Sequence, residues 1–264
     1  MKENTPNQKG TRMYIMVFDT ETTGLDKPFC YDVGYCILNT ESQLIELEKH
    51  FVVEQTWHNL QLFESAYYKE KRPLYIQLMR QHKAKMDKWG YVMQEMRRDI
   101  KKYNVAGAYA YNSDFDDKVF TFNCDWFKCN NPLEDIPIFD IWGYASEIIT
   151  TTKDYQSFCE TFDRFTDTGN YKSSAEVVFQ YIKNNPEFTE QHMGLYDTQI
   201  ESAILLHCID NGAQWQTNYK PKKILPRLVS HPFTIKVNGE EIYSGEYVKK
   251  YVREGLYSFT TSGH

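Results

Sequence analysis

The chain has no long apolar run, no CxxC cysteine pair and no surplus of positive charge, and each absence excludes a class of protein. No apolar stretch reaches the roughly 20 residues that a membrane-spanning helix needs, and the N-terminus lacks the apolar region of a signal peptide. We therefore expect a cytoplasmic protein of 264 residues with no membrane partner.

The six cysteines are scattered along the chain. The two that lie nearest in sequence, Cys124 and Cys129, have no second pair with which to complete a zinc site. Free, mostly buried thiols in a reducing compartment are the expected alternative.

The formal net charge of −6 argues against a protein that coats duplex nucleic acid, because such binding depends on neutralising phosphates. It does not exclude a nuclease, since a metal site concentrates acidic side chains and bound cations reverse the local field. Aromatic residues make up 16% of the chain, which leaves rings available to stack on bases.

The most informative stretch is residues 14–24, an apolar run that ends in Asp19, Glu21 and a Thr-Thr-Gly turn. A strand alternates its faces with period two, so Asp19 and Glu21 project from the same side of a strand that is apolar on both faces. Two such carboxylates repel each other unless a cation lies between them, and oxygen ligands suit Mg²⁺ or Mn²⁺. Alone, the stretch fits equally well a strand that runs into a turn.

A third acid, Asp116, follows the apolar run 105–111 and lies near the start of a predicted helix. It shares the apolar stripe of Val119 and Phe120 and should face the core, whereas Asp114 and Asp117 should face solvent. The alternative is an ordinary acid in the first turn of a helix, which the helix dipole favours. Because Asp116 lies on the apolar stripe, we prefer the interpretation as a ligand.

A third segment places His192 just before a helix predicted from about Gly194 to Asn211. Asp197 lies one turn before the buried stripe of that helix, so it should face inward, with Glu201 as its neighbour. By itself His192 fits an ordinary loop histidine.

Taken in order, the three segments resemble the three motifs of the DEDD (DnaQ-like, RNase T-like) 3′→5′ exonuclease superfamily. The third segment is similar to the His-x4-Asp form called DEDDh, since the other form needs a Tyr where this chain has Met193. The resemblance covers about residues 12–212, and the segment 172–188 is similar to the approach to the third motif in bacterial and phage-encoded members. A phage-encoded protein would act in the host cytoplasm.

The resemblance implies an α/β fold with an RNase H-like mixed five-stranded sheet flanked by helices. It also implies two Mg²⁺ or Mn²⁺ ions held by four acids, with His192 taking a proton from the attacking water. The four predicted metal ligands, all of which are also predicted catalytic residues, are Asp19, Glu21, Asp116 and Asp197.

The predicted substrate contacts, again implied by the resemblance, lie in two turns. Backbone amides at Thr22, Thr23 and Gly24 would hold the terminal 3′-hydroxyl, with Leu25 as an apolar wedge against the base. Asn112 either contacts the substrate or orders its own turn by capping the helix that follows.

We expect an exonuclease domain over 1–212 with a helical insert at about 59–103, and a small α+β appendage over 213–264. In the appendage, Asn238-Gly239 predicts a hairpin between strands 233–237 and 240–243, and 247–253 fits a short helix. The appendage could pack on the core, guide substrate or dock a partner.

The leading functional hypothesis is a metal-dependent 3′→5′ exonuclease that releases nucleoside monophosphates from single-stranded DNA ends, in proofreading or end trimming. An RNA-trimming exoribonuclease or oligoribonuclease with the same site is the alternative. The expected partner is a single-stranded nucleic acid with a free 3′ end. A polymerase or replication-protein partner, and a non-catalytic nucleic-acid-binding module, are the further hypotheses.

Overall fold

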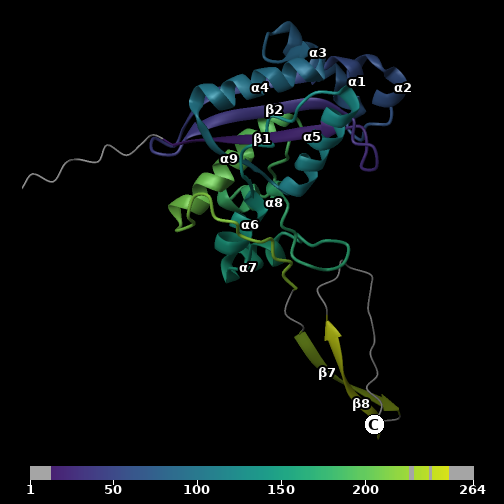
Figure 1. Ribbon diagram of the computed structural model, residues 1–264. Helices are drawn as coiled ribbons and strands as arrows, with labels where there is room; N and C mark the ends of the chain where they lie inside the picture. The colour runs from purple at the N-terminus through teal and green to yellow at the C-terminus, as the bar shows by residue number, and fades with distance from the viewer. Residues whose placement is uncertain (1–12, 226–228, 238–239, 250–264) are drawn as a thin grey trace, which may run out of the picture.

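The computed structural model describes residues 13–225, 229–237 and 240–249 and is built on a mixed six-stranded sheet (Figure 1). The order of the strands is β4-β3-β2-β1-β5-β6. Neighbours are antiparallel in β3-β2-β1 and parallel in β1-β5-β6 and β3-β4. The bounds are β1 Tyr14–Thr22, β2 Cys30–Asn39, β3 Leu44–Val53, β4 Lys85–Asp87, β5 Val105–Ala110 and β6 Ile138–Asp140.

The predicted RNase H-like α/β class is confirmed, but the expected count of five strands is wrong. The additional strand is β4, which adds to the free edge of β3 within the segment that we expected to be helical. Three residues are too few to display the period-two alternation by which a strand is detected in sequence.

Strand β1 lies at the centre of the sheet and its apolar residues are buried on both faces, as its sequence predicts. Ile15 and Val17 belong to one core cluster, and Met16 and Phe18 to another on the opposite face. The alternation places the side of Ile15 and Val17, which continues to Asp19 and Glu21, toward the C-terminal helices.

Helices cover both faces of the sheet, so that it forms the middle of three layers (Figure 1). One layer contains α4 Trp89–Tyr103 and α5 Ser113–Phe127. The other contains α6 Ile141–Ala145, the π-helix η2 Ser146–Thr150, α7 Lys153–Thr161, α8 Ala175–Ile182 and α9 Gly194–Asp210. No helix in the described part of the chain is long and apolar enough to cross a membrane.

The predicted insert between β3 and β5 has a small core of its own. Its elements before β4 and α4 are α1 Glu54–His58, α2 Leu60–Phe63, the 3-10 helix η1 Lys69–Lys71 and α3 Arg72–Arg80. Trp57, Phe63 and Tyr75 pack there against Tyr31 of β2 and against Met193. Met193 follows His192 directly, so the insert packs on the third predicted motif.

The segment that follows α9 packs against the main core through Trp215, Tyr219 and Ile224. Tyr109 and Tyr144 lie there against Trp215 and Tyr219 respectively. The predicted hairpin is confirmed as β7 Val229–Val237 and β8 Glu240–Lys249. The expected helix over 247–253 is wrong for 247–249, which belong to β8, and its other residues lie outside the described part.

Strand β2 and helix α9 meet backbone to backbone at Gly34 and Gly194. A Cβ atom added at Gly34 would overlap the backbone of Gly194 and Leu195. Gly34 pairs with Asp19 across the sheet, so this contact brings the first turn of α9, and with it Asp197, next to Asp19. Only a pair of residues without side chains permits this approach.

We predict that Gly34→Ala lowers the free energy of unfolding by about 1–3 kcal/mol or more, because backbone atoms cannot move aside as a flexible side chain does. Urea denaturation measures the change. The control is Gly90→Ala in α4, where an added Cβ has open space and should leave stability unchanged or slightly raised. Equal stability of the two variants would contradict the close contact.

Candidate active site

The first two predicted acids lie at the end of the central strand. Asp19 and Glu21 project from the face of β1 that α9 covers, and the backbone of Gly194 lies against that of Asp19. The Asp19 Oδ2 atom is buried and has no hydrogen-bond partner among the described residues. The strand therefore carries a buried carboxylate oxygen that no donor in this part of the chain compensates.

The third acid comes from α5. Asp116 is 3% exposed and accepts a hydrogen bond from the Thr20 hydroxyl at 2.6 Å, whereas Asp114 and Asp117 are exposed. The predicted division between one inward and two solvent-facing acids is therefore what the structure shows. Thr20 lies between Asp19 and Glu21, so its hydroxyl connects α5 to the same strand end.

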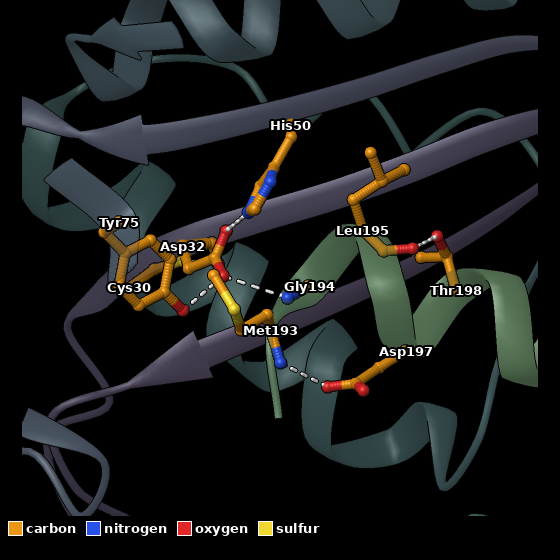
Figure 2. A network of polar contacts seen from close by, with 9 residues as sticks. All are labelled: Cys30, Asp32, His50, Tyr75, Met193, Gly194, Leu195, Asp197 and Thr198. Atoms are coloured by element: carbon orange, nitrogen blue, oxygen red, sulfur yellow. Dashed lines mark hydrogen bonds and ion pairs between the residues drawn. The ribbon is translucent and has the colours of Figure 1, made fainter. Parts of the chain in front are cut away.

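The fourth acid lies in the first turn of α9. Asp197 is 4% exposed, and its Oδ2 atom accepts the backbone N–H of Met193 at 2.6 Å, as Figure 2 shows. Its Oδ1 atom is buried without a partner. One oxygen thus fixes the start of the helix while the other is left for a ligand.

Burial and mutual repulsion raise the pKa of all four carboxyls. The pKa of Asp19 and of Glu21 lies well above the ordinary value, chiefly through burial and then through Asp116 for Asp19 and Asp197 for Glu21. Burial raises the pKa of Asp116 to about 7 against the opposing hydrogen bond from Thr20. It raises the pKa of Asp197 to about 8, with Glu190 as the next cause. These acids come from three separate segments and meet in one place.

The residues present fit a divalent cation. Buried carboxylate oxygens at Asp19 and Asp197 have no hydrogen-bond partner within the described residues, which is costly unless a ligand compensates them. Ligand atoms of Glu21, His192 and Asp197 lie within 4.8 Å of one another. An oxygen-rich donor set of this kind suits Mg²⁺ or Mn²⁺, and Glu21, His192 and Asp197 are the residues that could hold such an ion. Among the described residues, Asp19 and Asp116 do not fall within this group of ligand atoms.

His192 lies just outside α9, as predicted, between two pairs of acids. Besides Glu21 and Asp197 it approaches Glu176 and Glu190, and its Nδ1 atom is 3.8 Å from Glu190 Oε2. Burial, with Lys71 as the next cause, lowers the pKa of His192, so the imidazole favours the neutral form that accepts a proton.

The predicted substrate residues lie at the rim, in two turns. Thr22 ends β1, Gly24 is exposed and the side chain of Leu25 is 82% exposed. Thr23 is buried and its amide already donates to the Phe29 carbonyl at 3.0 Å, so that amide is not free for a substrate.

Asn112 is exposed but does not cap α5 with its side chain, so the predicted cap is wrong. Its backbone is left-handed, with φ +62°, and its amide donates to Asp140 Oδ1 at 2.9 Å. An N-cap residue normally has an extended backbone that brings its side chain back over the first turn, and a left-handed one does not.

Sequence reasoning missed Asp32, which is fully buried in β2 directly opposite Glu21. Tyr75 donates to its Oδ2 atom at 2.5 Å and the Gly194 amide at 2.9 Å, while His50 Nε2 lies 2.7 Å from its Oδ1 atom (Figure 2). The signal was available, because a charged residue within an otherwise apolar strand requires partners.

Glu201, anticipated only as a neighbour of Asp197, is also buried. It lies one turn further along α9, and its Oε2 atom accepts the Tyr111 amide at 3.2 Å. Burial and then Asp116 raise its pKa well above the ordinary value. It thus adds a fifth carboxyl group to the side of the site nearest β5.

No protein family model matches the sequence, and no curated protein matches it. The structure is similar to the nuclease domain of 3′hExo, a DEDDh family member bound to rAMP, with a TM-score of 0.49 and 13% identity over 80% of this chain and 98% of that one. It is similar to a 3′-exonuclease that recognises the 3′ end of a histone mRNA stem-loop, with a TM-score of 0.49 and 11% identity over 88% of this chain and 90% of that one. It is also similar to the metal-free E. coli ExoI–ssDNA complex, with a TM-score of 0.45 and 14% identity over 73% of this chain and 39% of that one.

Because the identities are low and the TM-scores lie below 0.5, the roles of individual residues rest on the geometry described above.

We predict that the protein freed of metal with EDTA loses stability as pH rises from about 4 to about 8. The folded pKa values of Asp116, about 7, and Asp197, about 8, exceed the value of about 4 in an unfolded chain. The folded state therefore binds more protons in this range, and its stability falls as they are released. Thermal denaturation across this range measures the effect.

Two comparisons make the measurement specific. Asp197→Asn should flatten the dependence on pH, because the amide does not titrate. Mn²⁺ should raise the melting temperature of the wild type at pH 8 and that of the variant much less. If the melting temperature of the wild type changed neither with pH nor on addition of Mn²⁺, the cation site would be contradicted.

Proposed function

We propose that the chain is a metal-dependent 3′→5′ exonuclease that releases nucleoside monophosphates from single-stranded DNA ends by two-metal-ion hydrolysis. One observation carries the proposal: Glu21 of β1 and Asp197 of α9 offer ligand atoms within 4.8 Å of those of His192, and among the described residues Asp19 and Asp197 each keep a buried carboxylate oxygen without a partner. The set of four acids and one histidine is complete, which argues against a non-catalytic binding module.

Divalent ions bound at such a site supply positive charge for the attacking water and for the phosphate in the transition state. The protein supplies the rest. Asp19, Glu21, Asp116 and Asp197 provide the negative charge that would hold such ions. Asp116 and Asp197 are buried, and Asp19 and Glu21 are partly buried. His192 accepts the proton of the attacking water, which a neutral imidazole at the rim of the site can do.

For the strand, we propose that the exposed turn of Thr22, Gly24 and Leu25 receives the terminal nucleotide. Leu25 offers an apolar side chain to the base, and the Gly24 backbone is open to solvent. Asn112 lies exposed at the start of α5, where it suits a contact with the strand. A polymerase or replication-protein partner would belong to a proofreading role, for which copurification is the test.

We predict stepwise shortening of a 5′-labelled single-stranded DNA in Mg²⁺ or Mn²⁺, and no reaction in EDTA. Duplex DNA and RNA of the same sequence, run in parallel, decide between the DNA hypothesis and the RNA-trimming alternative. Asp116→Asn should abolish the reaction, because it removes a buried negative charge. Asp117→Asn, the adjacent exposed acid, is the control and should react like the wild type. Full activity of Asp116→Asn would refute the proposed cation ligands.

We predict that His192→Ala lowers kcat by about 10²–10⁴-fold, the usual contribution of a general base. The apparent affinity for Mn²⁺, measured by calorimetry, should be little changed, because the four acids remain. If the variant lost Mn²⁺ binding instead, His192 would be a ligand rather than the base.

A further inference from the structure

The helical insert places side chains directly against the histidine of the site. The ring of Tyr68, which precedes η1, stacks on the His192 imidazole with centroids 4.4 Å apart and planes 10° apart. Lys71, at the end of η1, lies 4.0 Å from the centroid of the Tyr68 ring and donates a hydrogen bond from its Nζ atom to the Gln191 carbonyl. The stack of Tyr68 on His192 and the hydrogen bond from Lys71 to Gln191 each join segments more than 100 residues apart in sequence.

The backbone at His192 needs such support. Its φ is +48°, in the left-handed region, which residues with a side chain rarely adopt. A conformation of this kind persists only where surrounding contacts over-determine it. The stack on Tyr68 and the bond from Lys71 to the adjacent Gln191 are contacts of that type.

The insert also holds the other end of the same segment. Tyr75 of α3 donates to Asp32, and Asp32 accepts the amide of Gly194, the first residue of α9. Between the two ends, Met193 is fully buried in the small core that contains Trp57 and Tyr75. Gln191, His192 and Met193 therefore each contact the insert directly, and Gly194 is connected to it through Asp32.

The role of Lys71 differs from that of a surface lysine. Within the described part of the chain no carboxylate oxygen lies within 4.0 Å of its Nζ atom, although Glu21, Asp197 and Glu190 are its charged neighbours. Its hydrogen bond is made to a backbone carbonyl, so it fixes the path of the chain beside His192.

We propose that the insert is a clamp on residues 191–194, and that Tyr68 and Lys71 are positioning residues for the proton-accepting imidazole. The ring of Tyr68 fixes the plane of the imidazole, and Lys71 fixes the backbone that carries it. The consequence for catalysis rests on the proposed nuclease function, whereas the contact itself does not. If Tyr68 instead stacked on a substrate base, its loss would raise KM rather than lower kcat.

The kinetic test uses the full chain with Tyr68→Leu, Tyr68→Phe and Lys71→Met on a labelled oligonucleotide. Tyr68→Leu removes the ring and should lower kcat by about 10- to 100-fold, the scale expected for a misplaced catalytic group, with KM unchanged. Tyr68→Phe keeps the ring and should retain the wild-type kcat. Lys71→Met should lower kcat in the same way as Tyr68→Leu. The control is Tyr91→Leu, a 57% exposed tyrosine on α4 of the same insert, which should act like the wild type.

A structural test does not depend on activity. The stacked ring of Tyr68 should shift the His192 ring protons upfield in the NMR spectrum of the labelled protein. The shift should vanish in Tyr68→Leu and persist in Tyr68→Phe and Tyr91→Leu. If the wild type cleaves no nucleic acid yet shows the shift, the clamp stands and the proposed function fails. If the shift is absent, or if kcat of Tyr68→Leu equals that of the wild type, the proposal is overturned.

Discussion

The repulsion among buried carboxylates is the constraint on which this site depends. Asp116 and Asp197 raise the pKa of both Asp19 and Glu21, and left alone these acids would favour a structure in which they separate. The fold prevents separation because each acid is attached to an element that is fixed elsewhere by apolar packing. The central strand is buried on both faces, α5 packs through Val119 and Phe120, and α9 packs through Ile204 and Leu205.

The approach of α9 to the sheet completes this arrangement. Contact between Gly34 and Gly194 lets the N-terminus of the helix reach the level of the acids, while Asp32 satisfies the amide of Gly194. The positive end of the helix dipole then lies beside negative charge, which offsets part of the repulsion. The repulsion that the helix dipole does not offset is what bound cations would neutralise, and Asp19 and Asp197 each have a buried oxygen available for this.

Much of this arrangement could be predicted from the sequence, because local patterns encode it. The alternation of β1 placed Asp19 and Glu21, and the helical spacing of Asp116 to Phe120 separated the inward acid from its exposed neighbours. The features that were missed depend on long-range contacts. Strand β4 exists because the edge of β3 accepts it, Asn112 takes a left-handed backbone instead of capping, and Asp32 acquires its donors from three other elements. The roles of Tyr68 and Lys71 had no local signal at all.

The small core shared by the insert and Met193 has a consequence for engineering. Tyr31 and Met193 are fully buried there, yet neither belongs to the insert: Tyr31 lies in β2 and Met193 directly precedes α9. A miniaturised version of the domain that omitted residues 54–84 would expose both side chains to water and leave the Asp32 carboxylate without the Tyr75 hydroxyl. A shortened chain therefore has to keep residues 54–84, or replace the aromatic side chains of this small core with others that cover Tyr31 and Met193.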